Sequence, residues 1–138
     1  MRAVAALLVF VASIALEWSA AAFSPDIDYA VHCQGCHRAD GSGTPGSVPP
    51  LAGSVGKLLR VPGGRAFVVQ VPGVSTAPVD DASLAAIVNW MLERFGKDDL
   101  PADFVPYTAE EVGTLRRTPL TEVDEVRARI MAAAPPVE

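Results

Sequence analysis

The residues with the clearest chemical content in this sequence are Cys33, Cys36 and His37, which form the pattern Cys-x-x-Cys-His. Two thiols with this spacing can each add across one vinyl group of a porphyrin, and the pattern is typical of haem c attachment. The histidine that follows can then lie under the iron and supply an imidazole nitrogen to it. The sequence therefore predicts one covalent haem c, anchored by Cys33 and Cys36, with His37 as the proximal iron ligand.

Other uses of the two thiols can be weighed directly, because the chain contains only two cysteines. A thioredoxin-like redox pair follows a strand in a βαβ unit, whereas residues 24–31 indicate a short helix with Ser24 as its cap and Pro25 in its first turn. A structural zinc site needs a second, separated pair of ligands, and the neighbouring His32 is better explained as an exposed neighbour of the haem. Haem attachment is the favoured interpretation, and a redox dithiol or disulfide is the alternative.

Residues 1–22 have the pattern of a secretory signal. Met1 is followed by one positive residue, Arg2, and residues 3–16 form an apolar run that is short for a membrane span. Residues 19–22 are small enough for a cleavage site. We expect cleavage near Ala22, no stable membrane span after cleavage, and a mature protein in the periplasm or another extracytoplasmic space. An uncleaved N-terminal anchor is the alternative.

The composition indicates one small acidic domain. The chain has 138 residues, half of them hydrophobic, and a formal net charge of −5. Cleavage near Ala22 would remove one arginine and one glutamate and leave that charge unchanged. The acidic balance argues against nucleic acid and anionic membrane surfaces as partners, and it favours a redox partner with a basic docking patch.

The segment after the motif completes a wider pattern. Residues 38–53 are rich in glycine and proline and have almost no periodicity, which predicts a loop. Tyr-Ala-Val-His-Cys-Gln-Gly-Cys-His-Arg-Ala-Asp-Gly at 29–41 and Pro-Pro-Leu-Ala-Gly at 49–53 together resemble a class I c-type cytochrome. The resemblance implies a small all-α domain around one haem, attached outside the cytoplasm. It also implies that the carbonyl of Pro50 orients the axial histidine.

Two further segments are expected to surround the haem. Residues 66–71 are rich in valine and favour a strand on propensity, but the resemblance implies a short helix from about residue 63, and we favour the helix. Residues 80–95 have apolar side chains at helical spacing after a pair of capping aspartates. The resemblance implies that this helix crosses the first one, with Tyr29 in contact with Trp90.

Residues 97–138 lie beyond the resemblance and indicate an extension of two helices. Thr-Ala-Glu-Glu at 108–111 is a capping box that opens the first, and Pro119 interrupts it. The second starts at about Thr121 and has one apolar stripe. Packing on the core is the favoured role of the extension, and clamping a partner is the alternative. The expected organisation is a signal peptide at 1–22, a cytochrome c-like haem domain at 23–96 and a helical extension at 97–138.

The sixth iron ligand is where the sequence departs from the resemblance. In class I cytochromes that carry electrons, a methionine from the loop before the last helix binds the iron and raises the reduction potential. Here that loop, residues 71–79, contains no methionine. Met91 is the distal candidate, although its position on an apolar helix face also suits a core residue. The alternatives are Met131, Lys57, an open or water-filled position, or a ligand from another chain.

These features predict electron transfer without a catalytic reaction. We expect an exported monohaem cytochrome, not an enzyme, that carries single electrons from an extracytoplasmic dehydrogenase to a downstream acceptor, alone or as a subunit of a complex. Nothing in the sequence resembles a nucleotide-binding loop, a catalytic triad or a second active site. The alternative function is a haem-based sensor or binder of a small ligand at an open sixth coordination position.

Overall fold

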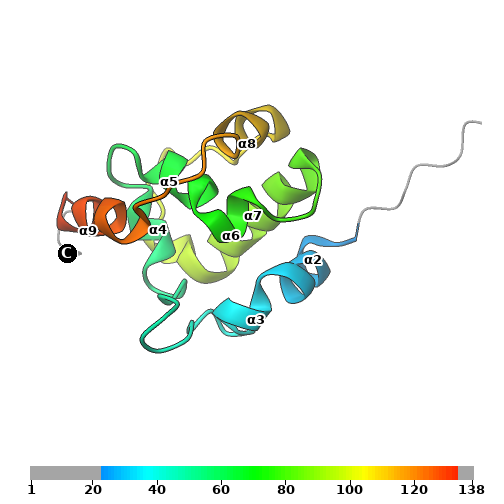
Figure 1. Cartoon of the computed structure of the whole chain (residues 1–138), viewed down its shortest axis with the longest axis horizontal. Helices are drawn as coiled ribbons and strands as arrows, with labels where there is room; N and C mark the ends of the chain where they lie inside the picture. Colours follow the sequence, from blue (N-terminus) through cyan, green and yellow to red (C-terminus); the bar gives the residue numbers. More distant parts are fainter. Residues whose placement is uncertain (1–22, 134–138) are drawn as a thin grey trace, which may run out of the picture.

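The computed structural model describes residues 23–133, whose regular secondary structure is helical (Figure 1). The expected signal peptide lies outside the described residues. Within them, no helix is long and apolar enough to cross a membrane. The predicted all-α fold is confirmed.

In chain order the elements are α2 (Pro25–His32), α3 (Gln34–His37), α4 (Val55–Leu58), α5 (Gly64–Gln70), α6 (Pro72–Ser75), α7 (Asp81–Gly96), the 3-10 helix η1 (Lys97–Asp99), α8 (Ala109–Leu115) and α9 (Val123–Ala133).

Helix α7 is the element on which the others pack, with α8, α2 and α4 as its principal neighbours (Figure 1). It begins where the sequence predicts, because the Asp80 carboxylate accepts a hydrogen bond from the backbone N–H of Ser83 at 2.7 Å. Its apolar stripe forms the centre of the hydrophobic core. The buried residues of α7 are Leu84, Ala85, Ile87, Val88, Met91, Leu92 and Gly96.

An aromatic cluster fixes α2 against α7. The rings of Tyr29 and Trp90 lie 5.1 Å apart, which confirms the predicted contact, and Phe95 joins them at 5.5 and 5.9 Å. The Tyr29 hydroxyl also donates to the carbonyl oxygen of Arg38 at 2.8 Å. Arg38 has a φ of 63°, a conformation that costs free energy in a residue with a Cβ. Tyr29 therefore stabilises the turn that directly follows His37.

Residues 64–70 form helix α5 and not the strand that valine-rich propensity favours. Gly63 has a φ of 84° and precedes the first turn, and Gly64 lies so close to the Leu58 carbonyl that a Cβ would clash with it. One face of the helix, with Phe67 and Val68, is buried in the core. Tertiary packing thus outweighs the local strand preference, and the predicted helix is confirmed.

The two expected helices of the C-terminal segment also form. Helix α8 packs on α7 and α5, and α9 packs on α4 and α5. The Thr108 hydroxyl accepts from the backbone N–H of Glu111 at 3.2 Å, which is one half of the predicted capping box. The Glu111 carboxylate instead pairs with Arg65 of α5. Because three of its side chains are buried in the core, this segment shares the hydrophobic core of residues 23–96. The three are Tyr107, Val112 and Ile130.

Candidate functional site

A cavity of about 360 Å³ lies beside the Cys-x-x-Cys-His motif, and Cys33, Cys36 and His37 all line it. The rest of its wall comes from the loop at 47–54 and from helices that are distant in sequence. Its lining is mainly apolar, as is typical of cofactor pockets. The apolar lining residues include Val48, Leu51, Val55, Leu58, Phe67, Val68, Val71, Val74, Met91 and Val123.

The environment of the two thiols disfavours the redox alternative. Both cysteines are free, Cys33 partly buried and Cys36 exposed. Burial raises the pKa of the Cys33 thiol, and the Asp28 carboxylate and the Cys36 thiol act in the same direction. A redox-active cysteine needs the opposite shift, because the thiolate is the nucleophile. Among residues 23–133, no group of three or more histidine, cysteine or acidic side chains could hold a metal ion, so the zinc alternative lacks a ligand set there.

His37 has an environment suited to an iron ligand. Burial lowers the pKa of its imidazole, and the Arg127 cation lowers it further, so the ring is neutral near pH 7 and keeps a lone pair for a metal. Its Nδ1 atom is buried and has no hydrogen-bond partner. The expected hydrogen bond to the Pro50 carbonyl is not formed in this structure, where that oxygen accepts from the Ser54 hydroxyl. Pro50 also lines the cavity and its carbonyl has a second lone pair, so its orienting role stays a prediction.

Short-range hydrogen bonds fold the loop after the motif back onto it. The Thr44 hydroxyl donates to the Cys36 carbonyl at 3.0 Å, and the N–H of Gly43 donates to the His37 carbonyl at 3.1 Å. Gly43 has a φ of 72°, and a Cβ there would clash with the backbone of Val48 and Pro49. This tight loop is what brings the proline segment to the cavity.

Another part of the wall comes from residues 71–74 at the start of the loop before α7. The lining residues of this part are Val71, Pro72, Gly73 and Val74, and none of them has a side chain that can bind iron. Of the methionines in the described chain, Met91 lines the cavity and Met131 does not, and Lys57 is also absent from the lining. Met91 therefore stays the distal candidate.

Helix α9 contributes residues that the sequence analysis missed. Val123, Asp124 and Arg127 line the cavity, as does the exposed His32 beside the motif. Burial lowers the pKa of Arg127, which shows that its cation is partly removed from water. The sequence feature that could have indicated these cavity residues is the four-residue spacing of Val123 and Arg127, which places both on one face of the helix. Local sequence did not indicate that this face covers the motif.

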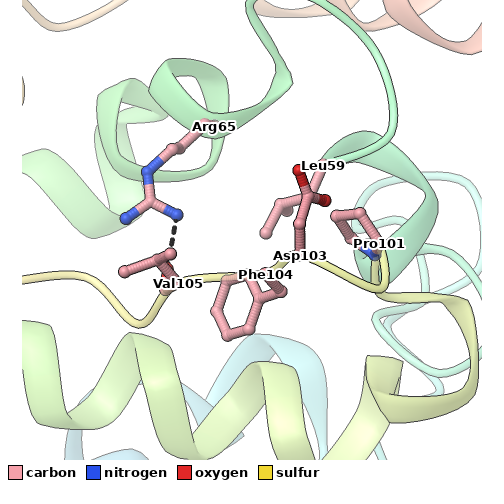
Figure 2. A pocket seen from close by; sticks show the side chains of 6 residues that line it. All are labelled: Leu59, Arg65, Pro101, Asp103, Phe104 and Val105. Atoms are coloured by element: carbon pink, nitrogen blue, oxygen red, sulfur yellow. Dashed lines mark hydrogen bonds between the residues drawn. The ribbon is translucent and has the colours of Figure 1, made fainter.

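A second hollow, of about 350 Å³, lies on the surface away from the motif (Figure 2). Its one cationic side chain, Arg65, is already engaged. The guanidinium donates to the Val105 carbonyl at 2.7 Å, pairs with the Glu111 carboxylate and lies 4.0 Å from the centre of the Tyr107 ring. These contacts tie α5 to the segment before α8, so Arg65 has a structural role.

The comparisons with known proteins agree with this site. No family model matches the chain. The chain is 36% identical over 107 residues to cytochrome c-552 of Thermus thermophilus, a match that covers 64% of this chain and 82% of the relative. A protein of the same name from a specified strain of that species is equally similar, with 72% of its length covered. The chain belongs to the class I monohaem c-type cytochromes. It is a c-type cytochrome electron carrier that binds one covalent haem c with its iron.

The residues at the cavity fit the haem of this cytochrome family. The two free thiols and His37, whose buried Nδ1 has no hydrogen-bond partner, lie together on a mainly apolar wall. Arg127 adds a cation that can face the anionic propionates of a porphyrin. When bound, the haem supplies the one-electron chemistry of its iron, and the protein supplies the ligands, the apolar shell and the balancing charge.

Proposed function

We propose that this cytochrome is an exported carrier of single electrons between an extracytoplasmic dehydrogenase and a downstream acceptor, alone or as a subunit of a complex. The observation that supports this proposal best is the meeting of Cys33, Cys36 and His37 at one apolar cavity in a chain of the cytochrome c family. The net charge of −5 supports a partner with a basic docking patch.

Each residue has a distinct part in this proposal. Cys33 and Cys36 anchor the haem through thioether bonds, and the neutral His37 imidazole binds the iron. Pro50 accepts a hydrogen bond from His37 and fixes its tautomer. The apolar walls keep water from the iron, which disfavours the more highly charged ferric state and raises the reduction potential.

Carrier function can be tested on the purified holoprotein with two simple oxidants. We expect a spectroelectrochemical titration that fits one electron per haem. We also expect the cationic oxidant tris(phenanthroline)cobalt(III) to react faster relative to ferricyanide at low salt, with the difference shrinking as salt screens the acidic surface. Equal salt dependence for the two oxidants would contradict steering towards a basic partner, and a titration without one-electron behaviour would contradict the carrier function.

Export can be tested separately. Residues 1–30 fused to alkaline phosphatase should give activity only if the segment directs export, because this reporter needs an oxidising compartment for its disulfides. Deletion of residues 2–22 from the full chain should prevent haem attachment. A cytoplasmic protein with covalently bound haem would contradict the expected localisation.

A second candidate function, sensing or binding of a small ligand, is favoured by the composition of residues 71–74, which line the cavity with no iron ligand among them. Its test is the addition of carbon monoxide to the ferrous holoprotein. If Met91 binds the iron, a sulfur-to-iron charge-transfer band should be present and should disappear in Met91→Leu. If the band is absent and carbon monoxide binds readily, the sixth position is open and the second candidate is supported; if carbon monoxide does not bind, the second candidate is excluded.

A further inference from the structure

The side chain of Arg116 makes an unusual set of contacts with the loop between α6 and α7. Its Nε donates to the Ser75 carbonyl at 3.1 Å, Nη2 to the Ala77 carbonyl at 2.5 Å and Nη1 to the Val79 carbonyl at 2.8 Å. Nη1 also pairs with the Asp81 carboxylate at 3.0 Å. One guanidinium thus binds the carbonyls of every second residue from 75 to 79, together with the side chain of the first residue of α7.

The residues just after Arg116 hold the other end of the same segment. The N–H of Leu120 donates to the Gln70 carbonyl at 2.9 Å, and the Gln70 side chain donates to the Thr118 hydroxyl at 2.7 Å. Both ends of the segment 70–79 are therefore held by hydrogen bonds with residues 116–120. The part between these fastenings includes residues 71–74, which line the haem cavity.

This wall also has apolar contacts, since α6 packs on α5 and Val71 and Val74 pack against the core. Helix α6 is a single four-residue turn, too short to be stable by itself. Ser75 and Ala77 are buried, so removal of the guanidinium would cost each carbonyl a hydrogen bond, although the Ala77 carbonyl would keep its bond from the Val79 N–H. The position of the wall is therefore coupled to a side chain that does not itself line the cavity.

We propose that Arg116 is a positioning residue of the haem site, which holds residues 71–74 closed over the cavity and so limits the entry of water and small ligands. The inference rests on haem binding and is independent of which partners exchange electrons with the protein. A loosened wall should admit water, which stabilises the more highly charged ferric iron and lowers the reduction potential.

The test compares Arg116→Gln with Arg117→Gln in the holoprotein. Arg117 is the adjacent exposed arginine, whose side chain donates a hydrogen bond to the Thr114 hydroxyl, so its replacement removes the same charge and none of the hydrogen bonds to the 75–79 carbonyls. We expect Arg116→Gln to bind imidazole to the ferric haem severalfold faster than the wild type and to have a more negative reduction potential. Arg117→Gln should match the wild type in both.

Two further variants separate the contacts of Arg116. Asp81→Asn weakens the ion pair but leaves the three carbonyl contacts, so it should change the imidazole rate less than Arg116→Gln. Arg116→Lys keeps the charge, but its single nitrogen cannot reach the three carbonyls that Nε, Nη1 and Nη2 contact separately. It should therefore also bind imidazole faster, and it replaces the glutamine variant if that variant does not fold.

The proposal would be overturned if the reduction potential and the rate of imidazole binding of Arg116→Gln matched those of Arg117→Gln while its melting temperature was lower. The same holds for Arg116→Lys if that variant is used instead. That result would leave Arg116 with a purely structural role. It would be distinguishable from failure of the carrier function, which would appear in the wild-type protein as a lack of one-electron exchange.

Discussion

The attachment loop, which we define as residues 33–53 with the motif and the glycine- and proline-rich segment after it, and the 71–79 loop line the same cavity but are held in different ways. In the attachment loop, the hydrogen bond from Thr44 to Cys36 joins residues that are 8 positions apart. In the other loop, the bonds from Arg116 to Ser75 and from Gln70 to Thr118 join residues that are 41 and 48 positions apart. One wall is a local structure, whereas the other depends on the C-terminal segment.

This difference separates anchoring of the cofactor from control of its surroundings. The attachment loop contains the thiols and the histidine that define the cytochrome, and its own backbone positions them. The other wall contributes apolar cover and is positioned by α8 and the residues after it. Changes in the attachment loop should therefore affect haem ligation, and changes in α8 should affect stability and access to the cavity.

The largest effect is expected on the attachment side. His37→Ala should remove the proximal ligand and change the visible spectrum and reduction potential completely, because no other residue of the motif can replace the imidazole. His32→Ala is the matched control, since this exposed neighbour lies outside the motif and should leave the spectrum nearly unchanged. An unchanged spectrum and potential in His37→Ala would refute the assignment of the proximal ligand.

Gly43→Ala should show how strongly the attachment loop depends on its local geometry. The added Cβ would meet the carbonyl of Val48 and the backbone of Pro49, so we expect a loss of about 2–3 kcal/mol in the free energy of unfolding. Gly46→Ala is the control, because Gly46 also has a positive φ but open space around it. Denaturant unfolding should give a clearly smaller loss for Gly46→Ala, and equal losses would exclude the clash as the cause.

Val112→Ala tests the dependence on the C-terminal segment. Val112 of α8 has an exposed fraction of 0%, so removing two methyl groups should cost ~2 kcal/mol of unfolding free energy. Val105→Ala, at a side chain that is 65% exposed, should change it little. If Val112→Ala were as mild as this control, α8 would be dispensable for the stability of the core.

Thr108→Ala should have a smaller effect in the same region. Loss of the hydroxyl that caps α8 should cost ~1 kcal/mol in the free energy of unfolding. Thr114→Ala, at an exposed position of α8, removes a hydroxyl that donates back to the Glu110 carbonyl and accepts a long, exposed hydrogen bond from Arg117, so it should be nearly neutral. Chemical denaturation of the two variants side by side would show whether the cap contributes.

The smallest expected effect concerns alkaline pH. Burial raises the pKa of Tyr29 to about 12 and also raises the pKa of Tyr107, the other tyrosine of the chain. Between pH 10 and about 12 the folded state therefore binds more protons than the unfolded state, so stability should fall as pH rises through this range. Melting temperatures across the range should show a weaker decline in Tyr29→Phe. An equal decline would contradict the role of Tyr29.

The sequence by itself determined the features that depend on neighbours along the chain. Haem attachment at Cys33, Cys36 and His37 is predicted from the spacing of neighbouring residues, and haem c is the cofactor of the family to which the chain belongs. The caps at Asp80 and Thr108 form as predicted, because each joins residues three apart. Ser24 occupies the N-cap position of α2, but its side chain makes no capping hydrogen bond.

Only the tertiary structure decided which distant residues complete the cavity. Residues 64–70 are helical because core contacts outweigh the propensity of their valines. The Ser54 hydroxyl donates to the Pro50 carbonyl, Arg127 lines the cavity from α9, and Arg116 holds a loop that is distant in sequence. Hydrophobic periodicity can indicate which face of a helix is buried, but it does not specify the element that this face meets, because that pairing depends on how the whole chain packs.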